Sequence, residues 1–136
     1  MRTLPFILSL LLLAGCTTSQ VSPVPPGSSS IQSNDSDFVV HWSTRPTVIP
    51  VNDFFEVDVL LVDRDGTPLE EATLDVDAAM PHHNHGMNHL PLIERTGPGR
   101  WHVEDMLFHM PGYWELYFDV EEQGVTHRAQ EALEVD

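Results

Sequence analysis

The chain has 136 residues and a formal net charge of −15, because 21 acidic residues face only six lysines and arginines. That length predicts one domain. The strongly negative charge excludes nucleic acid as a partner, because its phosphates would be repelled. Cys16 is the single cysteine of the chain, which excludes an intrachain disulfide.

The first 15 residues have the features of a lipoprotein signal peptide. Arg2 gives a weakly positive start, and residues 4–13 form an apolar run that is too short to span a bilayer. The run ends in Leu13-Ala14-Gly15-Cys16, which resembles the bacterial lipobox. We therefore expect cleavage before Cys16 and lipidation of its sulfur with a diacylglyceryl group, with palmitate among the acyl chains. The competing interpretation, a core cysteine beside a buried helix, lacks an amphipathic pattern that would continue the run.

A lipidated Cys16 anchors the chain in a bilayer and cannot ligate a metal, which excludes cysteine-ligated zinc and blue-copper sites. Thr17 follows it, as in lipoproteins of the outer membrane, so the expected location is the outer membrane, facing the periplasm. Residues 16–36 are rich in serine and proline and predict a flexible linker. Residues 37–136 then form the folded domain.

From residue 38 onward, short alternating apolar runs are separated by turn residues such as Asp65-Gly66. The inward face of the second run is typical, with Phe55, Val57, Val59 and Leu61. No run has helical periodicity. The pattern predicts an all-β, seven-stranded immunoglobulin-like β-sandwich. The expected strands are residues 38–44, 54–62, 71–79, 90–95, 100–106, 113–121 and a last one that follows the turn at 121–124 and ends at 135.

Residues 80–89 carry four of the eight histidines and two of the five methionines. Imidazole suits copper, zinc and nickel, whereas thioether sulfur favours Cu(I), so this loop predicts a metal site. Copper, as Cu(I) or Cu(II), is the preferred ion, with zinc or nickel as alternatives. If successive strands alternate in direction, residues 107–112 reach the same end of the sandwich. Gly86 supplies the turn that lets His83 and His85 face back toward Met87 and His89. The predicted ligands are His82, His83, His85, Met87 and His89, supplemented by Met80, His109 and Met110.

The other histidines have simpler interpretations. His41 is expected at the surface, His102 as a packed or hydrogen-bonded side chain, and His127 at the far end from the loop. The chain contains no nucleophile elbow, phosphate-binding glycine loop or zinc-protease motif, so we expect no catalysis.

Two functions from different classes remain open on these residues. The first is a lipid-anchored metal-binding protein that acts as a copper chaperone, buffer or sensor. The second is a protein–protein interaction module of the cell envelope, whose histidine-rich loop responds to pH. A polar loop without ligand function is the simplest alternative to both.

Two segments resemble the bacterial YtkA-like family and its FixH-like relatives. They are Ala79-Met80-Pro81-His82 with the loop that follows, and the later run from Phe108 to Leu116, which reads FHMPGYWEL. The resemblance implies an immunoglobulin- or cupredoxin-type sandwich, export or lipid anchoring, and a link to copper handling and haem–copper oxidase assembly. A lipobox stands where FixH-type proteins have a transmembrane helix.

Overall fold

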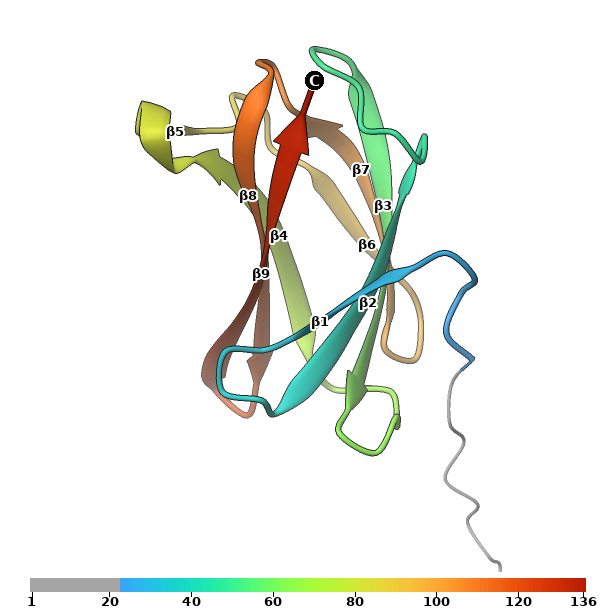
Figure 1. Ribbon diagram of the computed structural model, residues 1–136. Coiled ribbons are helices and arrows are strands. Elements are labelled where there is room, and N and C mark those ends of the chain that lie inside the picture. Colours follow the sequence, from blue (N-terminus) through green and yellow to red (C-terminus); the bar gives the residue numbers. More distant parts are fainter. Residues whose placement is uncertain (1–22) are drawn as a thin grey trace, which may run out of the picture.

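Two antiparallel sheets face each other in the computed structural model, which describes residues 23–136 (Figure 1). The predicted signal peptide and Cys16 lie outside the described residues. The sheet orders are β1-β2-β3-β7-β6 and β5-β4-β8-β9. The elements are β1 (Ser29–Gln32), β2 (Phe38–Arg45), β3 (Phe54–Asp63), β4 (Thr73–Met80), the 3-10 turn η1 (Pro81–His83), β5 (His85–Gly86), β6 (Leu92–Gly97), β7 (Arg100–Leu107), β8 (Gly112–Glu122) and β9 (Val125–Val135).

The strand order is that of an immunoglobulin constant-type sandwich. The seven predicted strands correspond to β2, β3, β4, β6, β7, β8 and β9. The first, second, fifth and fourth of them share one sheet, and the third, sixth and seventh share the other. The predicted β-sandwich is confirmed, with nine strands in place of seven because β1 and β5 each extend one sheet edge.

The strand β1 corrects the extent of the predicted linker. Residues 29–32 pair with the outer edge of β2, and Ile31 packs against the core. Beyond the strand, the buried Ser33 hydroxyl accepts hydrogen bonds from the backbone N–H groups of Asp37 and Phe38. The polar composition concealed this strand, because a short edge strand needs backbone partners more than apolar side chains.

The predicted alternation of apolar residues is confirmed in the core. The inward side chains of β3 and β8 are almost fully buried, and the two aromatic rings of Phe108 and Trp114 stack with centroids 4.5 Å apart. These rings lie at the end of the sandwich where β7 passes into β8. Burial of such aromatic surface supplies much of the folding free energy of a domain this small.

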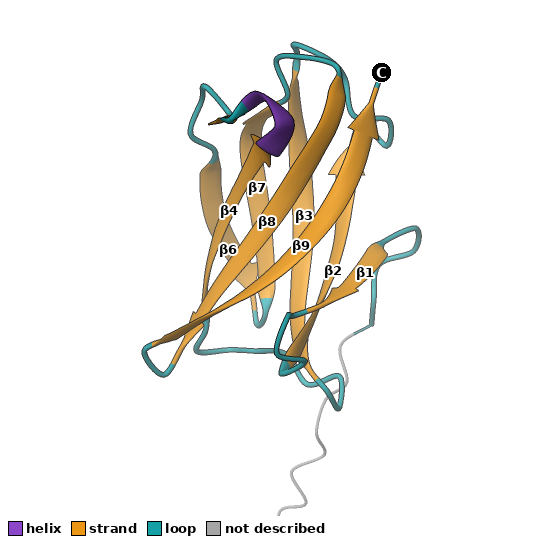
Figure 2. Cartoon of the chain, turned by 60° about the vertical axis from the view of Figure 1, so that its left-hand side comes forward, coloured by secondary structure: helices purple, strands orange, loops and turns teal. Residues whose placement is uncertain are grey.

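The loops β2–β3, β4–β6 and β7–β8 meet at one end of the sandwich (Figure 1). Asn52 of the first loop donates its backbone N–H to the carbonyl of Phe108 in the third, at 2.8 Å. Figure 2 shows the helical turn η1 at the same end. The predicted convergence of residues 80–89 with residues 107–112 is therefore present.

Candidate metal site

The histidine and methionine loop is folded back onto β4. After the turn of η1, Asn84 takes a left-handed conformation with φ of 57°, and His85 then pairs with Met80 in the short strand β5. Asparagine tolerates this conformation better than most residues. The turn prediction for Gly86 was wrong, because Gly86 lies in β5, where an added Cβ would be 3.2 Å from the carbonyl oxygen of Ala78.

Three imidazole rings come close together above Trp114. The ring centroids of His85 and His109 are 5.1 Å apart, and those of His83 and His85 are 5.8 Å apart. The indole of Trp114 meets His85 and His109 edge-on, at 6.2 Å and 5.6 Å. The Trp114 N–H donates to the carbonyl of Met110 at 3.0 Å, which fixes the β7–β8 loop beneath the histidines.

The Nδ1 atom of His109 is buried and has no hydrogen-bond partner within residues 23–136, a property that it shares there with Ser28 Oγ and the indole nitrogens of Trp42 and Trp101. A buried polar atom without a partner costs free energy, about 1–3 kcal/mol for a group of this kind, so its presence calls for an explanation. A metal ion bound to that nitrogen would satisfy it.

Two predicted ligands face away from this group. His82 stacks on the ring of Tyr113, with centroids 5.2 Å apart and planes within 22°. His89 contacts the ring of Phe54 edge-on, and its Nε2 lies 3.8 Å from a carboxylate oxygen of Asp105. The structure therefore brings His83, His85 and His109 together and directs the side chains of His82 and His89 elsewhere.

The three predicted methionine ligands differ in burial. Met80 ends β4 with 1% of its surface exposed, and its methyl group lies 3.3 Å from where a side chain on Gly112 would begin. Met87 and Met110 are partly buried and pack against the core. Met87 and Met110 therefore combine a soft sulfur with partial access to solvent, whereas Met80 is a core residue.

Sequence reasoning did not identify the aromatic residues around the histidines. Burial raises the pKa of the Tyr113 phenol, and the hydrogen bond that it donates to Glu115 raises it further. Tyr113 is the ring on which His82 stacks. The sequence signal was the dipeptide Tyr113-Trp114 directly after the Met-Pro-Gly turn.

Groups of three ligands whose donor atoms all lie within 4.8 Å of one another occur at two places in residues 23–136, and neither group includes a histidine of the loop end. One contains His102 with Glu56 and Glu104, and His102 is hydrogen-bonded, as predicted. In the other, His127 contacts the carboxylates of the β1–β2 loop. The side-chain hydrogen bond between His127 and Asp35 lowers the pKa of Asp35 to about 2 and raises that of His127.

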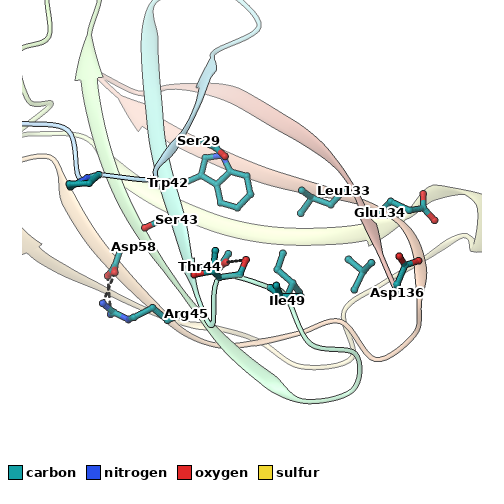
Figure 3. A pocket seen from close by; sticks show the side chains of 15 residues that line it. Ser29, Trp42, Ser43, Thr44, Arg45, Ile49, Asp58, Leu133, Glu134 and Asp136 are labelled. Carbon is teal, nitrogen blue, oxygen red and sulfur yellow. Dashed lines mark hydrogen bonds and ion pairs between the residues drawn. The ribbon is translucent and has the colours of Figure 1, made fainter.

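A separate hollow of about 680 Å³ lies between β2 and the end of β9 (Figure 3). It is lined by Trp42, Ile49 and Leu133 among others, and none of the predicted ligands borders it. Within residues 23–136, no helix is long and apolar enough to span a bilayer. The loop end of the sandwich is therefore the place where the predicted ligands gather.

The chain was compared with solved structures, curated proteins and family models. Two solved chains match; one is the "ZirS C-terminal Domain", at 13% identity and a TM-score of 0.41, covering 96% of this chain and 87% of that one. No curated protein matches. The family model described as YtkA-like matches residues 32–119, which is more than half of the chain and includes β2 through most of β8. The chain belongs to the YtkA-like family.

Proposed function

We propose that this YtkA-like protein is a lipid-anchored, non-catalytic copper-binding protein of the cell envelope, which carries, stores or senses the ion. The observation that supports it most directly is the buried, unpartnered Nδ1 of His109 beside the ring of His85. An ion bound there gives His109 the partner that the protein does not supply.

The softness of the available ligands favours copper. Met87 follows His85 by two residues and Met110 directly follows His109. Thioether sulfur prefers Cu(I), whereas imidazole accepts Cu(I), Cu(II), zinc and nickel. Two nitrogen ligands on one ion lie no more than about 4 Å apart. The ring centroids at 5.1 Å and 5.8 Å allow this after a rotation of the side chains.

The test is a competition for Cu(I) between the purified full-length protein and a chromophoric chelator. All variants carry Cys16→Ser, because a free thiol would itself bind Cu(I). We expect one ion per chain, and at least a tenfold loss of affinity in His85→Ala/His109→Ala. His41→Ala is the control, since His41 lies on β2 and bonds Ser30. Equal affinities in the double variant and the control would overturn the proposal, and repeating the titration with Cu(II), zinc and nickel ranks the ions.

Lipid anchoring is tested separately. Residues 13–16 predict lipidation of Cys16, so the protein from cells should partition into detergent and sediment with outer membranes. Cys16→Ser should release it to the soluble fraction. Recovery of both forms in the soluble fraction would contradict the anchor while leaving the metal site untouched.

A second candidate function is supported by exposed apolar side chains at the loop end. Exposed apolar groups that cluster on one end of a domain are typical of protein-binding surfaces. This would make the domain an envelope interaction module with a pH-sensitive histidine loop. Two results together would favour this function over copper binding. Leu90→Ser should lose a cross-linked envelope partner while its copper affinity stays unchanged, and the copper affinity should be equally weak in all histidine variants. The exposed side chains are Val48, Phe54, Leu90 and Leu92.

A further inference from the structure

A second group of ligands surrounds His102 on the outer face of the sheet that contains β3 and β7. The Nε2 atom of His102 lies 3.5 Å from Oε1 of Glu104 and 3.8 Å from Oε2 of Glu56. One donor atom from each of the three residues lies within 4.8 Å of the other two. An imidazole and two carboxylates therefore converge on one point.

The hydrogen bonding of His102 directs a lone pair toward this point. Its Nδ1 lies 2.9 Å from Oδ1 of Asp58. A carboxylate accepts hydrogen bonds, so Nδ1 carries a proton, and whenever the ring is neutral its Nε2 is an acceptor that faces Glu56 and Glu104. Three electron-rich atoms directed at one another repel. The Nε–H of Arg45, which bonds Oε2 of Glu56, offsets part of this repulsion, and a proton or a metal ion relieves the rest. A histidine that ligates metal commonly donates its other N–H to a carboxylate, as His102 does to Asp58.

A β-bulge opens space beside the three ligands. Phe55 pairs with Met106 and Val57 with Val103, so Glu56 alone opposes both Glu104 and Asp105. Asp105 has φ of 61°, and both acidic side chains are exposed. Bulges redirect side chains in this way. A hollow of about 330 Å³, lined in part by Glu56, Glu104 and Asp105, gives an ion and its waters access.

The charges at this place leave room for a cation. Arg45 donates its Nε–H to Glu56 at 3.1 Å, and its Nη1 lies 2.8 Å from Asp58, a pair that Figure 3 shows from the side of the other hollow. Among the described residues, Glu104 has no ion pair with an arginine. Three carboxylates with one guanidinium carry a net charge of −2, which one divalent cation neutralises.

We propose that Glu56, His102 and Glu104 bind a divalent metal ion of the class that accepts mixed imidazole and carboxylate ligands, such as Zn²⁺, with Asp58 as a positioning residue. Zinc sites of three protein ligands complete their coordination with water. This site contains no sulfur, so it differs in ion preference from the histidine and methionine loop. It stands whether or not the loop binds copper.

The test is a Zn²⁺ titration of the full-length Cys16→Ser protein, labelled with ¹⁵N in its histidines and followed by side-chain NMR. His102 is assigned by its absence in His102→Gln. We expect its Nε2 resonance to move with saturation while Nδ1 stays protonated. Glu104→Gln should weaken this response at least tenfold. Glu94→Gln is the matched control, because Glu94 is the register partner of His102 between β6 and β7 and its substitution removes the same charge. We expect the Zn²⁺ affinity of this control to change less than threefold.

The same spectra separate a metal site from an ion-pair cluster. If Nε2 of His102 does not respond to Zn²⁺, or if Glu104→Gln and Glu94→Gln weaken the response equally, the cluster holds a proton or nonspecific counterions and the proposal is overturned. Arg45→Gln supplies an independent check, since removal of the guanidinium should strengthen Zn²⁺ binding. Thermal unfolding of each variant verifies that the sandwich is intact.

Discussion

The imidazole rings of His85 and His109 lie 5.1 Å apart, although they belong to two different loops. The first sits in β5 at the edge of one sheet, and the second lies in the crossing from β7 to β8. Trp114 meets both rings from below, and its own ring is held by stacking on Phe108. Because Trp114 is fixed next to both histidines, its fluorescence should respond to an ion that binds between them.

Cu(II) bound at His85 and His109 is expected to quench the fluorescence of Trp114, because a paramagnetic ion a few ångströms from an indole provides a fast decay route. Trp114→Phe should therefore abolish most of the copper-dependent quenching. Trp101→Phe is the control, since Trp101 lies in β7 with the guanidinium of Arg95 over its ring. Quenching that survives in Trp114→Phe and disappears in Trp101→Phe would place the ion elsewhere.

Replacement of His109 by phenylalanine should raise the free energy of unfolding of the metal-free protein by about 1 kcal/mol, because it removes a buried nitrogen that has no partner within residues 23–136. The same change should remove copper affinity, which is the usual conflict between stability and a binding site. Urea unfolding measures the change in the free energy of unfolding. His83 is exposed and serves as the control, so His83→Phe should change the free energy of unfolding little. Equal effects in both variants would mean that the unpartnered Nδ1 of His109 does not destabilise the protein.

The strands and the inward faces of the sandwich could be predicted because alternation of apolar residues is a local signal. The bulge in β7 could also have been predicted, because the apolar residues Val103 and Met106, both buried, are three residues apart and break that alternation. The role of Asn84 in the loop was missed, because the turn depends on how β5 pairs with β4.

The surroundings of the histidines could be predicted only in part. Strand direction places His85 and His109 at one end, as expected, but it does not give the orientation of any ring. His82 and His89 turn toward Tyr113 and Phe54, which are contacts between residues distant in the sequence. Such contacts depend on how the loop packs against strands that are distant in the sequence, which no local pattern in the sequence contains.

The contact between Asp35 and His127 ties the β1–β2 loop to β9 and should make stability depend on pH. The pKa of Asp35 is lowered to about 2, so its contribution is present above the ordinary value of 3.8 and is lost as the pH falls through 2. The pKa of His127 is raised, so its contribution is present below its ordinary value of 6.5 and is lost as the pH rises past the raised value. The contact is therefore strongest between about pH 4 and pH 6.5.

Asp35→Asn should lower the urea midpoint most within that pH range, and the difference from wild type should vanish near pH 2 and shrink in alkaline buffer. His127→Gln should give the same profile. Asp65→Asn is the control, because it removes the same charge from the exposed turn after β3. A constant offset at every pH in Asp35→Asn would mean that the two side chains are not linked in solution.

Gly99→Ala should destabilise the sandwich far more than Gly124→Ala, although both glycines have positive φ, 60° and 79°. A Cβ at residue 99 would lie 2.5 Å from the carbonyl oxygen of Leu61, whereas one at residue 124 would meet nothing within 4 Å. The carbonyl of Gly99 also accepts the N–H of Leu61 at 2.7 Å, so relief of the clash would break a bond between the β6–β7 turn and β3. We expect the free energy of unfolding to fall by about 3 kcal/mol in Gly99→Ala and by about 1 kcal/mol in Gly124→Ala, where backbone strain is the only cost. Urea midpoints at equal slope measure both values, and equal losses would show that the β6–β7 turn moves freely away from β3.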